Sequence, residues 1–235
     1  MKPIDLPPHC DNCTNNNDIF CALSQGEKRM LSIDKNESYF KKGSIIFSEG
    51  EHANNLYCVY KGKIKLTKLG KDGKEQIVRF ASSGNILGYR SLLGNTPYQA
   101  KAIALDDSYI CVLSKERFFS IIEKNPMMSL KIIQLLTEDL KSAEQHLIDI
   151  TQKTVKERVA EALLILKNTF GFLMDGETLN VKISRADIAD MAGTTTESTI
   201  RTLALLHEEK IIQLNGKSII ITNINKLINC AAICD

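Results

Sequence analysis

Three cysteines near the N-terminus have the spacing of a soft-metal site. Cys10 and Cys13 form a C-x₂-C pair, and Cys21 follows after an Asn-rich segment. Thiolates are preferred ligands of zinc and of iron–sulfur clusters, and a C-x₂-C pair with a more distant Cys is a common way to supply them. For zinc, the neighbouring His9 is a candidate fourth ligand. The alternative is that these are spare thiols, as any Cys in a reducing compartment can be.

The other four cysteines carry weaker signals. Cys58 and Cys111 fall in β-rich runs, where a free Cys is most often a buried apolar residue. Cys230 and Cys234 are spaced by one helical turn near the end of the chain, and an unpaired tail is the simpler interpretation.

No apolar stretch has the length of a signal peptide or a membrane span, so we expect a cytoplasmic protein without membrane contact.

A second constellation, SRADIADMAGTTTES, has the residue types that contact DNA. Ser184 can cap a first helix, Gly193 falls at a turn, and Thr194 or Thr195 can cap a second helix. Two short helices joined by a Gly-bearing turn form a helix-turn-helix, whose second helix enters the major groove with a polar N-terminal turn. The string TTTES meets that requirement.

A β-hairpin follows this second helix. The string IIQLNGKSIIIT consists of two β-runs around Asn215-Gly216, and Lys217 at the tip can reach a phosphate. The added hairpin favours a winged helix-turn-helix over a generic helical hairpin. Residues 151–235 contain ten Lys and Arg against ten Asp and Glu. DNA contact therefore requires a local basic arrangement that a dimer doubles.

A long helix is predicted before this region, from residue 126 to about residue 151. Its apolar residues recur in alternating steps of 3 and 4, which is the pattern of a coiled-coil seam. A helix lying on its own barrel is the alternative, but so regular and narrow a seam favours a homodimer. The seam consists of Ile133, Leu136, Leu140, Ala143, Leu147 and Ile150.

The rest of the sequence predicts the strands and helices that position the cysteines and the helix-turn-helix. Residues 37–113 are short β-runs separated by Gly-centred turns, which predicts a barrel or sandwich. We expect helices at 24–31, 115–123 and 155–170, and a short strand at 179–183. The fold class is α+β, with a Cys-bearing segment (1–23), a β-barrel (24–125), a dimerisation helix (126–152) and a winged helix-turn-helix (153–235). No catalytic triad, carboxylate pair, P-loop or Rossmann glycine pattern is present, so we do not expect an enzyme.

From about residue 24 onward the chain resembles the CRP/FNR family of transcription regulators. The strings that carry the resemblance are KKGSIIFSEGE, LYCVYKGKIKL, SGNILGY and TVKERVAEALL, followed by the helix-turn-helix. The resemblance implies an N-terminal β-roll like that of cyclic-nucleotide-binding domains. It also implies a homodimer that binds a palindromic site on double-stranded DNA and works with RNA polymerase.

In the family, a Glu and an Arg four residues later contact base edges, and these match Glu197 and Arg201. A carboxylate can accept from cytosine N4, and an Arg can bind guanine O6 and N7. Thr196 can bond to base or phosphate, and Ile200 can contact a thymine methyl. The DNA-binding residues that we expect are Ser184, Thr195, Thr196, Glu197, Ile200, Arg201 and Lys217.

Two branches of the family imply different effectors. The cyclic-AMP branch binds ribose with a Glu and the phosphate with an Arg-Ser pair, but here Tyr89 and Tyr98-Gln99 stand at those positions, so cyclic AMP is not expected. The branch of FNR itself holds a [4Fe–4S] cluster on three N-terminal Cys and one barrel Cys, which Cys111 matches. The implied ligands are Cys10, Cys13, Cys21 and Cys111, although the gap from Cys13 to Cys21 is longer than usual. This implies a regulator that senses redox state, oxygen or NO; a regulator with a small-molecule effector or none is the alternative.

Overall fold

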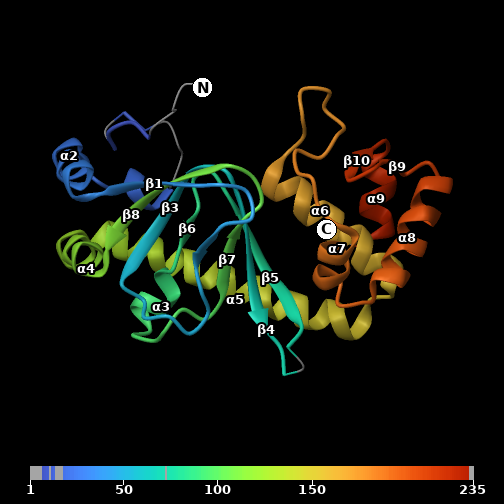
Figure 1. Ribbon diagram of the computed structural model, residues 1–235, viewed down its shortest axis with the longest axis horizontal. Coiled ribbons are helices and arrows are strands. Elements are labelled where there is room, and N and C mark those ends of the chain that lie inside the picture. Colours follow the sequence, from blue (N-terminus) through green and yellow to red (C-terminus); the bar gives the residue numbers. More distant parts are fainter. Residues whose placement is uncertain (1–6, 11, 14–17, 72, 233–235) are drawn as a thin grey trace. The chain divides into compact units, whose positions relative to one another are not determined.

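The computed structural model describes residues 7–10, 12–13, 18–71 and 73–232. These residues form two compact units, each with its own core. The first comprises the described residues within Met1–Lys68 and Ala81–Lys141, and the second those within Leu69–Phe80 and Ser142–Asp235. Figure 1 shows both units and labels most of their helices and strands.

Two four-stranded antiparallel sheets confirm the predicted β-roll, and they belong to the first unit except for residues 69–80. One sheet has the strand order β1-β8-β3-β6 and the other β2-β7-β4-β5. The strands are β1 (Asn36–Phe40), β2 (Ile45–Phe47), β3 (Asn55–Lys61), β4 (Lys63–Leu69), β5 (Glu75–Ser82), β6 (Ile86–Leu87), β7 (Lys101–Ala104) and β8 (Ser108–Ser114). The helices are α1 (Asp18–Cys21), α2 (Gln25–Asp34), α3 (Tyr89–Leu93), α4 (Lys115–Lys124) and the long α5 (Pro126–Gln152), whose residues from Ser142 onward belong to the second unit.

Strand β3 separates two apolar clusters because successive side chains of a strand point to opposite faces. Tyr57 and Val59 join the cluster between the sheets. Leu56 joins a cluster of residues from α2, α4 and α5, and Cys58 packs against the same cluster. The helix expected at 24–31 is α2, which begins with a capping box in which the Ser24 side chain accepts from Glu27 N–H and Glu27 accepts from Ser24 N–H.

Helix α5 has two apolar faces. Met128 and Ile132 are buried in the core of the first unit. On another face Ile133, Leu140 and Leu147 are 58%, 61% and 66% exposed in the single chain. The helix therefore contacts its own barrel through one face, against which the half-buried seam residue Leu136 also packs, and it leaves Ile133, Leu140 and Leu147 of the predicted seam exposed.

The second unit has the order expected of a winged helix-turn-helix. It contains α6 (Val155–Phe170), α7 (Arg185–Met191), α8 (Thr196–Glu208), the hairpin β9 (Ile212–Asn215) and β10 (Ser218–Ile221), and α9 (Ile224–Cys230). The expected strand at 179–183 is wrong. Only isolated bridges form there, Phe172↔Leu179 and Thr178↔Ile220, so the segment lacks a continuous strand partner. Among the described residues, no helix is long and apolar enough to span a membrane.

Candidate nucleic-acid interface and thiol pocket

Two capped helices and a turn form the candidate DNA-reading element. The Ser184 hydroxyl oxygen accepts from Asp187 N–H at 3.0 Å, so Ser184 caps α7. Gly193 adopts φ +56° at the turn, a backbone conformation that favours glycine. Helix α8 begins after Thr195, whose side chain accepts from Ser198 N–H at 3.1 Å. Of the two predicted caps, Thr195 therefore holds this position.

Helix α8 presents its polar N-terminal turn to solvent and buries its other side. Glu197 and Arg201 are exposed and lie one turn apart on the same face. Ile200, which is 51% exposed, lies beside them. On the opposite side Leu203 and Leu206 are fully buried and anchor the helix. A rigid helix thus displays a carboxylate, a guanidinium and an apolar group.

The hairpin β9–β10 places a basic residue at its tip. Ser218 pairs with Asn215, so Gly216 and Lys217 are the two loop residues, and Lys217 is exposed. The sequence analysis did not single out Arg185, although it follows the cap of α7. Arg185 Nη2 donates to Gly216 O at 3.0 Å, which ties α7 to the wing. Burial lowers the pKa of Arg185, and its buried Nη1 has no hydrogen-bond partner among the described residues.

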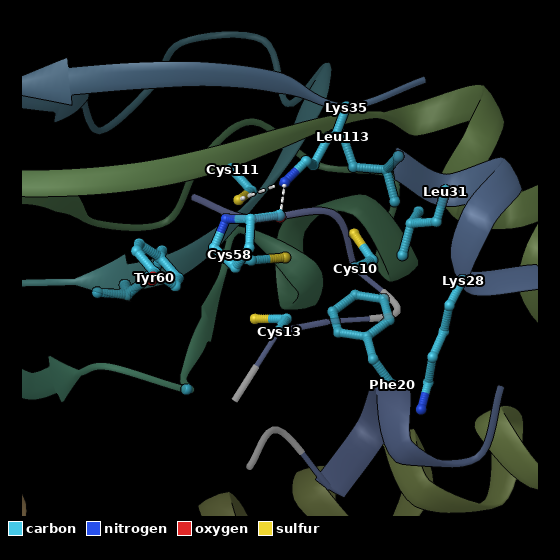
Figure 2. Close-up of a pocket in the computed structure, with 13 residues that line it drawn as sticks. Cys10, Cys13, Phe20, Lys28, Leu31, Lys35, Cys58, Tyr60, Cys111 and Leu113 are labelled. Carbon is cyan, nitrogen blue, oxygen red and sulfur yellow. Dashed lines mark hydrogen bonds between the residues drawn. The ribbon is translucent and has the colours of Figure 1, made fainter. Parts of the chain in front are cut away.

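A pocket in the first unit gathers thiols from distant parts of the sequence. Its volume is about 100 Å³, and Cys10, Cys13, Cys58 and Cys111 all line it. Figure 2 shows the four sulfurs around a common space, with Phe20 and Leu31 at its edge. Two of these thiols come from the N-terminal segment and two from neighbouring strands. A pocket lined by thiols suits a soft metal or an iron–sulfur cluster.

The two strand cysteines are direct neighbours, which the sequence could not show. Cys58 on β3 lies directly opposite Cys111 on the neighbouring strand β8. On the other side of β8, Glu37 of β1 lies opposite Cys111. Burial raises the pKa of Cys111 to about 11, while the Lys35 ammonium acts in the opposite direction. Burial also raises the pKa of Cys58 well above its usual value. Both are protonated thiols at neutral pH, so a metal would have to displace their protons.

The metal-binding side chains among the described residues indicate which kind of metal group suits the pocket. Among these, no three His, Cys, Asp or Glu side chains converge closely enough to hold a single ion. Cys21 belongs to α1, but its side chain lies outside what the structure describes. A [4Fe–4S] cluster attaches each thiolate to a different iron, so its ligands are spread more widely than those of one ion. Several thiols line one pocket, and thiolates are the ligands that such a cluster requires, so the chemistry of the pocket fits a [4Fe–4S] cluster.

The alternative zinc ligand and the C-terminal cysteines lie apart from this pocket. His9 is exposed and is not among the residues that line the pocket. Cys230 closes α9 in the other unit, where burial raises its pKa. Cys234 lies outside the described residues.

Aromatic side chains occupy the space between the two sheets. Phe47 stacks on Tyr98 at a centroid distance of 4.3 Å and on Tyr57 at 5.1 Å. The Tyr98 hydroxyl donates to Asn55 O at 2.8 Å and is buried. Tyr89 is also buried, and its hydroxyl donates to Asp139. At these two positions the chain therefore carries neutral, hydrogen-bonded side chains and neither a cation nor a carboxylate.

Comparison with known proteins agrees with this architecture. Residues 37–125 match the cyclic nucleotide-binding domain, and residues 157–230 match the Crp-like helix-turn-helix domain. The nitrogen fixation regulation protein FixK of Bradyrhizobium diazoefficiens is 30% identical over 91% of this chain and 92% of its own length. The fumarate and nitrate reduction regulatory protein of Vibrio cholerae is 26% identical over 96% and 91%. The structure of FixK2 from Bradyrhizobium japonicum matches with a TM-score of 0.75 and 27% identity, covering 86% of this chain and 99% of that one.

A nucleotide-binding-like β-roll, a long helix and a winged helix-turn-helix define a DNA-binding transcription regulator. The chain belongs to the CRP/FNR family, as its full-length similarity to FixK shows. The relatives that it matches are regulators and not enzymes.

Proposed function

We propose that this regulator is a homodimer that responds to redox state, oxygen or NO through a [4Fe–4S] cluster on Cys10, Cys13, Cys21 and Cys111. The observation that carries the proposal is the pocket that Cys10 and Cys13 share with Cys111, about a hundred residues away in the sequence. The similarity to the fumarate and nitrate reduction regulatory protein supports it. The proposed domains are the segment 1–23, the β-roll 24–125, the dimerisation helix 126–152 and the DNA-binding domain 153–235.

The cluster would supply a redox-sensitive link between segments of the chain. Ligation by Cys10, Cys13 and Cys111 would hold the N-terminal segment against β8. The first part of α5 packs in the same apolar cluster, through Met128 and Ile132. A change in that packing biases the dimer helix between two arrangements. Two recognition helices must lie about 34–36 Å apart to enter successive major grooves of a palindromic site. The arrangement of the dimer would therefore control DNA binding. RNA polymerase is the expected partner at that site.

The direct test is anaerobic reconstitution of the wild-type protein. We expect about four irons and four sulfides per chain and a broad visible absorption band, since thiolate-bound clusters of this kind absorb there. Exposure to air should remove the band and change the affinity for a palindromic DNA site. One zinc per chain without visible absorption would instead support the zinc interpretation. A chain that takes up no iron would retain only the DNA-binding function.

A small-molecule effector is the second candidate, because residues 37–125 match the cyclic nucleotide-binding domain. The stacked Phe47, Tyr57 and Tyr98 argue against a nucleotide between the sheets. Titration with cyclic AMP during DNA-binding measurements separates the two candidates. We expect no change in affinity.

The DNA-reading roles can be tested with two substitutions. Arg201→Ala should cost about 1–3 kcal/mol of binding free energy and relax the preference at one base position per half-site, since it removes a base-edge contact. Lys217→Ala should weaken binding to all sequences and flatten the dependence on salt, because it removes a phosphate contact. Affinities for specific and random DNA at several salt concentrations measure both effects. An equal loss on both DNAs for Arg201→Ala would remove it from base reading.

A further inference from the structure

A buried lysine lies in the thiol pocket, directly after α2. The Lys35 side chain is 6% exposed. Its Nζ donates to Pro8 O at 2.7 Å and to Cys111 Sγ at 3.8 Å, and it pairs with Glu37 Oε1 at 3.1 Å. An ammonium group has three N–H donors, so these three contacts use all of them. Figure 2 shows the bond from Lys35 to Cys111 as a dashed line.

These three contacts join three segments. Pro8 lies two residues before Cys10 in the N-terminal segment, whereas Cys111 belongs to β8 and Glu37 to β1. Cys10 N–H donates to Ser32 Oγ at 2.5 Å, which adds a second tie between this segment and α2. Lys35 thus connects the segment that carries two candidate ligands to the strand that carries another.

The charge of Lys35 also suits what the pocket would hold. Four thiolates around a [4Fe–4S]²⁺ core leave a net charge of about −2, and burying an uncompensated charge is costly. Hydrogen bonds to the ligand sulfurs and the local net charge set how readily such a cluster loses an electron. A cation bonded to the Cys111 sulfur stabilises the more negative form, and the Glu37 carboxylate beside it has the opposite effect.

We propose that Lys35 is a positioning residue of the thiol pocket: it ties the N-terminal segment to the barrel through Pro8 O and makes the bound cluster harder to oxidise through its bond to Cys111. Only the effect on cluster oxidation rests on the proposed function; the tie through Pro8 does not. The Glu37 carboxylate opposes the effect on oxidation.

The test compares oxidative loss of the cluster in matched variants. After anaerobic loading, each protein is exposed to air and the decay of the visible band is followed. Lys35→Met should lose the band severalfold faster than wild type, Lys35→Arg should restore a rate near that of wild type, and Glu37→Gln should lose it more slowly. Lys28→Met is the control, because Lys28 lines the same pocket but its ammonium points away from the thiols (Figure 2). It should decay as wild type does.

Opposite signs for Lys35→Met and Glu37→Gln distinguish a charge effect from loosened packing. Equal rates in both variants, or acceleration in both, would overturn the charge role. The tie to Pro8 is tested separately in the iron-free proteins by hydrogen–deuterium exchange. The peptide that contains Pro8 and Cys10 should exchange faster in Lys35→Met than in Lys28→Met, and equal exchange would overturn the tie. If the wild type takes up no iron, the proposed function and the charge role fail together, while the exchange measurement still decides the tie.

Discussion

Replacing Cys111 with Ser is expected to abolish the iron–sulfur cluster as completely as replacing Cys10. The two residues lie about a hundred positions apart, yet they line one pocket. A hard hydroxyl oxygen does not replace a soft thiolate on iron, so the remaining cysteines cannot hold an intact cubane. Iron and sulfide analysis after anaerobic reconstitution should show near-complete loss in both variants. Any dependence of DNA binding on oxygen should disappear with it.

Cys58→Ser is the matched control, because Cys58 is also a strand thiol and lies directly opposite Cys111. It is expected to change packing and stability while iron binding persists. Cys21→Ser belongs in the same series, and we expect it to lose the cluster. If Cys58→Ser loses iron and Cys21→Ser keeps it, the fourth ligand is Cys58. Retention of metal in Cys111→Ser as one zinc per chain would contradict the cluster altogether.

Placing a charge in the seam of α5 is expected to convert the proposed dimer into monomers. Leu140 and Leu147 are 61% and 66% exposed in the single chain, so a partner helix is needed to bury them. Leu140→Glu or Leu147→Glu would bury an unpaired carboxylate between two helices, which is strongly unfavourable. A monomer contacts one half-site, so its affinity should fall toward the non-specific level, by roughly 10³-fold or more. Sedimentation and DNA-binding titrations measure the two effects.

The control for the seam is a charge change elsewhere on the same helix. Glu138→Lys alters an exposed residue off the seam and should leave a dimer that binds DNA normally. If both leucine variants remain dimeric, the exposed apolar face of α5 has another role and the dimer forms elsewhere.

Local signals in the sequence were enough to predict most elements. Helix caps depend on residues three positions apart, and the boxes at Ser24 and Ser184 both form. The wing followed from Asn215-Gly216, although the register makes Gly216 and Lys217 the loop residues. The strand expected at 179–183 failed for a non-local reason. Its alternating apolar residues are buried, but a strand also needs a continuous partner, and only isolated bridges were available.

The sequence by itself determined the family, the order of the domains, the helix-turn-helix and the cysteines worth testing, because spacing and turn chemistry are local properties of the chain. Only the tertiary structure placed Cys58 opposite Cys111, Lys35 between Pro8 and Cys111, and Arg185 against the wing. These pairs are separated by 27 to 76 residues. Their proximity depends on strand register and on how the segments pack, which no short stretch of sequence encodes.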